Sequence, residues 1–260
     1  MDNILEIYHY TDIWLLIFCR IVAAIITLPI VIETKLPAIA IGGLTGILSM
    51  IVFFTIPFEA VYYAENVLEF GIVIVKEVLV GLIIGFSFGI FFQVYNFFGQ
   101  LLSTQGGLGM STIMDPNSFT QVPIIGKFYT LAFATIFVAS GGYHWFIAAL
   151  VETFYYIPVG KAIINPEIMH SVLDAVILFF EMGFKLASPV VGVIVVVDCG
   201  LGILARVVPQ MNMFVVGLPI KLIILFLLMI ALMEVIGPYN NFIIETIVNE
   251  FFNIIEGLVP

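Results

Sequence analysis

The chain has 260 residues, of which 62% are hydrophobic and only 10% are charged, and its mean hydropathy is +1.22. Soluble globular domains carry about a quarter charged residues, so this composition excludes a soluble domain and predicts an integral membrane protein. The 18 acidic residues outnumber the 8 basic ones and give a net charge of −10. This balance argues against nucleic acid as a partner and against a polybasic lipid-binding surface.

Apolar segments recur along the chain at lengths that suit membrane helices. The first covers residues 13–32 and the second covers residues 36–58. About 20 apolar residues cross a hydrocarbon core of roughly 30 Å, so each segment predicts one span. Residues 78–114 form a third apolar region that holds no charge. This region is too long for a single span, which predicts that its helix ends before the region does.

The second half of the chain predicts helices that are broken or kinked. Further helical segments are expected over residues 128–151, 169–197 with a continuation over 200–208, 220–236, and a C-terminal amphipathic helix over 240–260. Glycine and proline indicate breaks at Gly141-Gly142, Ser188-Pro189 and Gly237-Pro238. The expected fold is therefore an all-α membrane protein of about six to eight apolar, partly kinked helices in one domain over residues 1–260.

Residues 93–127 differ from the other apolar stretches because polar side chains line one helix face. Gln93, Asn96, Gln100 and Ser103 recur at spacings of three, four and three. A glycine-rich segment then follows from Gln105, and glycine disfavours a helix by roughly 1 kcal/mol per residue relative to alanine. The pattern predicts a polar-striped, broken helix that lines a cavity at membrane depth. A plain inter-helix loop, with its polar groups satisfied by neighbouring helices, is the alternative.

Several charged side chains lie inside apolar sequence, where each costs about 2.5–3.5 kcal/mol at the bilayer centre and should face protein or water. They are Arg20, Lys76, Glu77, Lys185, Asp198, Arg206 and Lys221. Lys76 and Glu77 point about 100° apart on a helix, so they are expected to contact different neighbours. Asp198 and Arg206 are about two turns apart and within reach of a shared polar face. One interpretation is a proton or ion relay; structural pairing between helices is the other, favoured because few acids lie deep in apolar sequence.

Small and sulfur-containing residues add two packing expectations. Gly81, Gly85 and Gly89 form a ridge on one helix face, which favours close packing against another helix. Met110 and Met114 flank the glycine-rich segment, and adaptable thioethers suit a seal around an irregular object. They are equally ordinary as core residues.

No catalytic constellation is present in the sequence. The three histidines, His9, His144 and His170, are scattered, and none has a second ligand at metal-binding spacing. The Gly106–Gly109 stretch lacks the lysine and hydroxyl residue of a phosphate-binding loop. The chain is therefore not expected to be an enzyme or to hold a cofactor.

Three groups of residues carry a resemblance to a known family. The most specific is the run ARVVPQMNMF over residues 205–214 with GLPIK over 217–221. Lys76-Glu77 with Gly81 and Gly85, followed by Gln105, Gly107 and Asp115-Pro116, form the second group, and Gly142, His144 and Pro158 to Gly160 form the third. Together they resemble the R-subunit (FliR) family of the flagellar type III secretion export gate, whose injectisome counterpart is very similar. The resemblance runs nearly end to end.

The resemblance implies an all-helical subunit of kinked hairpins that joins the P and Q subunits in a helical, pore-forming assembly with one copy of this chain. Other membrane export components, unfolded export substrates and lipid are further implied partners, in the bacterial cytoplasmic membrane at the flagellar basal body. The family's plug loop falls on about residues 105–118. Its implied gate residues here are Gln105, Gly106, Gly107, Gly109, Met110, Met114, Asp115 and Pro116. Residues expected as buried charges or for packing between subunits are Lys76, Glu77, Gly81, Gly85, Asp198, Arg206 and Lys221.

Two functions remain open on the sequence. A gate subunit for protein export, in a flagellar rather than an injectisome system, is favoured, and it should require its partners for stability. A secondary transporter for a small solute, with Glu77 or Asp198 as coupling carboxylate, should act alone or as a homo-oligomer.

Overall fold

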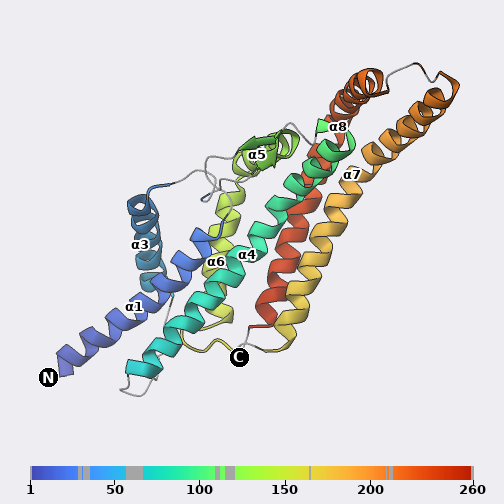
Figure 1. Cartoon of the computed structure of the whole chain (residues 1–260). Coiled ribbons are helices and arrows are strands. Elements are labelled where there is room, and N and C mark those ends of the chain that lie inside the picture. The colour runs from blue at the N-terminus through green and yellow to red at the C-terminus, as the bar shows by residue number, and fades with distance from the viewer. Residues whose placement is uncertain are drawn as a thin grey trace. The chain divides into compact units, whose positions relative to one another are not determined.

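The computed structural model describes residues 2–28, 31, 36–56, 67–108, 112–114, 121–163, 165–208, 210 and 213–258 (Figure 1). Over these residues the helices are α1 (Asp2–Ile26), α3 (Ala38–Thr55), α4 (Val67–Gln105), α5 (Ile124–Ala139), α6 (Gly142–Tyr156), α7 (Glu167–Val207) and α8 (Met213–Glu256). Two short strands, β1 (Thr112–Met114) and β2 (Gln121–Pro123), form an antiparallel ribbon. The prediction of an all-α membrane protein is confirmed, apart from this ribbon.

Three helices of the described residues are long and apolar enough to cross a membrane. They are α3, α7 from Ile168, and α8 from Val215, and the bent pair α5–α6 adds a fourth if it counts as one span. The axes of α5 and α6 differ by 72°. Gly141, at the bend, has a φ of 79°, which favours glycine because a side chain there would be strained. The break expected at Gly141-Gly142 is thus confirmed.

The breaks expected at Ser188-Pro189 and Gly237-Pro238 are wrong. Helix α7 continues through Pro189, and α8 continues through Pro219 and Pro238, so residues 240–256 are the end of α8 rather than a separate helix. Proline frees the carbonyl four residues earlier, but the Ser188 hydroxyl donates to that carbonyl, Lys185 O, at 2.9 Å. In apolar surroundings a helix is the only way to satisfy the remaining backbone groups, so one lost bond does not break it.

The chain divides into two compact units. The first comprises residues 1–90, 137–175 and 247–260, and the second comprises residues 91–136 and 176–246. In the first unit α1 and α3 lie side by side (Figure 1), with the Tyr10 and Phe53 rings 6.2 Å apart. Phe88 of α4 joins two other elements there, because its ring lies 4.9 Å from Phe146 of α6 and 5.1 Å from Phe251 of α8.

Glycine lets α4 approach α1 closely within the first unit. A Cβ at Gly81 would overlap the backbone oxygen of Arg20, and a Cβ at Gly85 would overlap the Thr27 hydroxyl. The ridge that the sequence indicated therefore packs against a helix of the same chain. A larger residue at either glycine would push the two backbones apart.

The second unit contains a similar close crossing and a long antiparallel pair. Gly99 of α4 faces Gly126 of α5, where a Cβ on Gly99 would overlap the Gly126 backbone. Helices α7 and α8 run alongside each other in opposite directions (Figure 1), and the Tyr239 hydroxyl of α8 donates to Met182 O of α7 at 2.8 Å. Tyr95 of α4 also donates a hydrogen bond to Asn240 of α8. These contacts hold α4, α5, α7 and α8 together within this unit.

Candidate functional site

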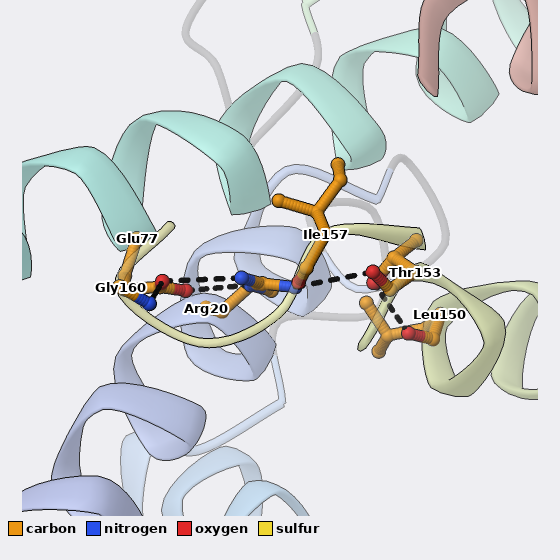
Figure 2. A network of polar contacts seen from close by, with 6 residues as sticks. All are labelled: Arg20, Glu77, Leu150, Thr153, Ile157 and Gly160. Carbon is orange, nitrogen blue, oxygen red and sulfur yellow. Dashed lines mark hydrogen bonds and ion pairs between the residues drawn. The ribbon is translucent and has the colours of Figure 1, made fainter. Parts of the chain in front are cut away.

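A fully buried ion pair lies at the centre of the first unit. Arg20 of α1 and Glu77 of α4 are both 0% exposed, and Arg20 Nε lies 2.6 Å from Glu77 Oε2. Arg20 Nη2 donates to the second carboxylate oxygen at 3.1 Å. The guanidinium and the carboxylate therefore meet through two parallel bonds, the strongest geometry for such a pair (Figure 2).

The end of α6 supplies the remaining partners of this pair, which together we call the Arg20 cluster (Arg20, Glu77, Thr153, Ile157 and Gly160). Arg20 Nη1 donates to Ile157 O at 2.9 Å and to Thr153 O at 3.4 Å. These carbonyls lie at a helix C-terminus, where unpaired oxygens carry partial negative charge and stabilise a cation. The Phe154 ring adds a cation–π contact 4.3 Å from Arg20 Cζ.

The loop after α6 completes the cluster through a glycine. Gly160 has a φ of 79°, and its backbone N–H donates to Glu77 Oε1 at 2.7 Å (Figure 2). A residue with a side chain would be strained in this conformation. The cluster therefore ties α1, α4, α6 and the loop after α6 through charge-assisted bonds that are closed to solvent. Such an arrangement positions helices, and it leaves the Glu77 carboxylate already satisfied.

The polar stripe predicted on α4 is divided between different environments in the second unit. Gln93 and Gln100 are exposed, and Asn96 is half-buried. The Asn96 amide donates to Gln93 Oε1 at 3.1 Å, and its oxygen faces Gly126 of α5. Ser103 is buried, and its hydroxyl finds no hydrogen-bond partner among the described residues. The two glutamines thus lie on the surface of this chain, with Gln93 bonded to Asn96, while the other two members face its interior.

The glycine-rich segment begins where α4 ends, at Gln105. Gly106 N–H donates to Leu102 O at 2.8 Å, and Gly107 has a φ of 80°, which closes the helix in a left-handed turn. A Cβ on Gly106 would overlap the Leu225 side chain of α8, and one on Gly107 would lie 2.7 Å from Leu218 Cδ2. The segment therefore starts in close contact with α8.

The ribbon comes after this turn, and its strand β1 includes Met114 of the predicted gate segment. Ile113 pairs with Val122 at its centre, and Met114 of β1 pairs with Gln121 of β2. The antiparallel pairing places residues 112–114 beside residues 121–123. The turn residues in the sequence did not predict this pairing. The other predicted gate residues, Gly109, Met110, Asp115 and Pro116, lie outside the described residues.

The remaining charges sit closer to the surface of the chain than the sequence implied. Asp198 of α7 pairs with Lys221 of α8 at 2.7 Å, and their side chains are 44% and 17% exposed. Arg206 is exposed at the end of α7, and Lys185 pairs with Glu181 on the surface of α7. Asp198 thus contacts the neighbouring antiparallel helix instead of sharing a polar face with Arg206. Lys76, adjacent to Glu77, is half-buried.

The pairing of Arg20 with Glu77 is the main feature that sequence reasoning missed. The signal was present, because Arg20 lies deep in the first apolar segment and Glu77 is one of the few acids deep in apolar sequence. The two are 57 residues apart, and spacing along one helix holds no information on such pairs. Among the described residues, no group of three or more His, Cys, Asp or Glu side chains could hold a metal ion.

Comparison with known proteins places this architecture in a family. Residues 12–247 match the sequence model of the family described as "Bacterial export proteins, family 1". Over 241 residues the chain is 31% identical to flagellar biosynthetic protein FliR of Bacillus subtilis, covering 91% of this chain and 90% of that protein. It is 28% identical over 244 residues to FliR of Escherichia coli, covering 92% and 90%.

A relative with a different name aligns over a shorter stretch. Surface presentation of antigens protein SpaR of Shigella flexneri is 29% identical over 157 residues, which cover 60% of each chain. The family match spans both compact units and includes Arg20, Glu77 and Gly160 within its limits. The chain therefore belongs to the FliR family of bacterial export proteins.

Proposed function

We propose that this chain is a pore-forming gate subunit of the type III protein export apparatus, located in the bacterial cytoplasmic membrane and required for flagellum assembly. The observation that carries the proposal is the family match over residues 12–247. FliR of Escherichia coli and FliR of Bacillus subtilis align over 92% and 91% of the chain and other relatives of that name over as little as 64%, against 60% for SpaR. This difference favours a flagellar over an injectisome system.

The end of α4 supplies the gate in this proposal. The turn at Gly106 and Gly107 and the β1–β2 ribbon form the segment that closes the pore, with Gln93 and Gln100 exposed on the preceding helix. Backbone outside a helix is tolerated at membrane depth where it is buried in protein or lines a water-filled cavity. A gate segment that withdraws as an unfolded polypeptide passes is one such use.

Partner subunits, the P and Q subunits of the gate, cover the exposed apolar faces of α7 and α8 in this proposal. On α7 these faces include Ile177, Phe184 and Val196, and on α8 they include Ile223, Phe226 and Ile230, each more than half exposed in the isolated chain. Either lipid or protein can cover such faces, so their extent alone does not identify a partner. The partner assignment rests on membership of the family.

Native mass spectrometry tests the proposal directly. The chain is purified from cells that co-express its candidate P and Q partners, and the masses of intact complexes are measured. One defined hetero-complex with a single copy of this chain is the expected result. A stable homo-oligomer that ignores both partners would contradict it.

The transporter alternative receives less support from the arrangement of acids. Glu77 accepts hydrogen bonds on both carboxylate oxygens, from Arg20 and from Gly160. Asp198 is paired with Lys221. A coupling carboxylate must be free to bind and release its ion, whereas a basic side chain already engages each of these two carboxylates. Solute uptake into liposomes holding this chain alone would revive the alternative.

A further inference from the structure

A groove lined by aromatic rings lies in the first unit, apart from the Arg20 cluster. It has a volume of about 360 Å³, in the range of small-molecule sites. Helix α6 contributes one face of it, since His144, Ala148 and Glu152 follow at four-residue intervals with Trp145 beside them. Phe88 of α4 and the end of α8 supply the rest of the lining.

The groove combines aromatic rings with one carboxylate. The rings are those of Phe88, Trp145, Phe251 and Phe252, and Phe88 and Phe251 are almost completely buried. Glu152 is exposed at the groove, and no hydrogen bond or ion pair engages it among the described residues. Aromatic faces attract cations, and a carboxylate accepts hydrogen bonds from an ammonium group. The lining is therefore complementary to an organic cation with an apolar portion.

Helix α6 carries further side chains that indicate where this cation would come from. Tyr143, Trp145, Tyr155 and Tyr156 are each 44–58% exposed on this helix. Exposed tyrosine and tryptophan are enriched at the level of the lipid headgroups, where their apolar body and polar tip both find partners. A groove on a helix at that level would meet lipid headgroups.

We propose that this groove binds a phospholipid with a primary ammonium headgroup, of the phosphatidylethanolamine class. The ammonium donates to the Glu152 carboxylate, and the rest of the headgroup extends along α6 toward His144 and Trp145, which lie about two helical turns away, on the order of 10–12 Å along the axis. Part of one acyl chain packs over Phe252. A choline headgroup has no N–H to donate to Glu152, and a phosphatidylglycerol headgroup has no cation to offset the repulsion between its phosphate and Glu152, so the carboxylate favours the primary amine. This proposal is independent of the role in export.

Lipid retention tests the proposal on the full chain with the subunits that co-purify with it. The sample is equilibrated with micelles that contain phosphatidylethanolamine, phosphatidylcholine or phosphatidylglycerol of matched acyl chains, and bound lipid is counted by native mass spectrometry. Preferential retention of one phosphatidylethanolamine per copy of this chain is expected. Glu152→Gln should weaken that retention roughly tenfold, because it removes a charge-assisted hydrogen bond.

Matched variants keep the test decisive. Glu256→Gln makes the same charge change at an exposed residue of α8 outside the groove, and it should leave retention unchanged. Trp145→Ala should weaken binding of the ethanolamine lipid, whereas Trp145→Phe should restore part of it. If the three lipids are retained equally and Glu152→Gln changes nothing, the proposal is overturned, because any lipid then fills the groove as an apolar surface. If a partner protein covers Trp145 and the complex retains no lipid, the proposal is overturned as well.

Discussion

Arg20 illustrates how one buried charge is made tolerable by several partners at once. Its Nε, Nη1 and Nη2 atoms all donate, to one carboxylate and to two carbonyls at the end of a helix. Burying an ion pair is itself close to neutral compared with an apolar pair, but removing one partner leaves a buried charge without compensation. The cluster thus specifies which helices meet, more than it adds stability.

Replacing one member of the pair should therefore be worse than replacing both. We expect Arg20→Leu or Glu77→Leu to destabilise the first unit by about 3–5 kcal/mol, and the double variant to lose less than either single one. Thermal unfolding of the purified complexes, arranged as a double-mutant cycle, measures the coupling. Arg20→Lys serves as the control for charge, since it keeps one positive centre and loses the planar fork. Additive losses in the cycle would contradict direct coupling.

Single residues were identified from the sequence more readily than their partners were. Apolar surroundings marked Arg20, Glu77 and Asp198 as charges that should face protein or water, and each of them has a charged partner within this chain. The identity of each partner depends on which helices become neighbours. Asp198 meets Lys221 because α7 and α8 run antiparallel, and no spacing along α7 could indicate this.

Helix α4 shows at the scale of elements how small residues set the distance between helices. Gly81 and Gly85 contact α1 in the first unit, and Gly99 contacts Gly126 of α5 in the second. The sequence indicated the first ridge through its four-residue spacing. The Gly99–Gly126 contact joins two single glycines on different helices, so no repeat revealed it.

The Gly99 crossing can be tested with a matched pair of variants on the same helix. We expect Gly99→Ala to destabilise the protein by about 1–3 kcal/mol, because the new Cβ meets backbone that cannot move aside. Gly71→Ala places the same methyl group in open space on α4 and should stabilise the helix by roughly 0.5–1 kcal/mol. Chemical denaturation of both variants provides the comparison. If both variants changed the stability equally, the crossing of α4 and α5 would have room for the added methyl group, which would contradict the prediction.

Proline was the least reliable guide to where helices end. Two Gly- or Ser-Pro pairs were expected to interrupt α7 and α8, and neither does. A proline within a helix costs the free energy of the one backbone hydrogen bond that it removes. Ending the helix leaves several backbone groups without partners, and the free energy of that change depends on the surroundings. In an apolar environment the cost of ending the helix exceeds the cost of one lost hydrogen bond. At Pro189 the Ser188 hydroxyl reduces the latter, because it donates to the carbonyl that the proline leaves free.

The gate segment leads to a prediction about an intact assembly. Deleting Gly106 to Gly109 shortens the segment that closes the proposed pore, so the complex should assemble at normal yield but conduct ions when no substrate is present. Conductance of the purified complex in planar bilayers measures the leak. Gly46→Ala, at a glycine with open space around it, is the control and should leave the pore closed. A closed gate in the deletion variant would remove this segment from the mechanism.

The isolated chain exposes more apolar surface than is usual for a folded monomer. In the three candidate spans only 17% of each apolar window is buried within the chain. A lone helix bundle of this size would normally bury more of its apolar residues, so lipid or other proteins must cover the rest. Composition predicted the membrane, and the resemblance to a family of export proteins was needed for the partners.

Arg206, at the exposed end of α7, belongs to this outer surface. We expect Arg206→Leu to lower the yield of the hetero-complex, because an acidic partner on another subunit would be left unpaired. Lys185→Leu is the control, since Lys185 is an exposed member of a pair on α7 whose contribution is roughly 0.3–0.5 kcal/mol. Native mass spectrometry of the co-expressed subunits quantifies both. Wild-type yield for Arg206→Leu would show that the residue contacts no buried acid in the assembly.

The wide separation of the Arg20 partners along the chain has a consequence for biogenesis. Glu77 follows Arg20 by 57 residues, and Ile157 follows it by 137. During synthesis Arg20 can therefore pair with Glu77 early. The carbonyls that accept hydrogen bonds from its Nη1 group become accessible only after the end of α6 has left the ribosome. A nascent chain that stops before Gly160 holds a guanidinium and a carboxylate that are each incompletely bonded. The first unit therefore cannot satisfy its buried ion pair before the loop after α6 has been made, and residues 247–260 must still follow before the unit is complete.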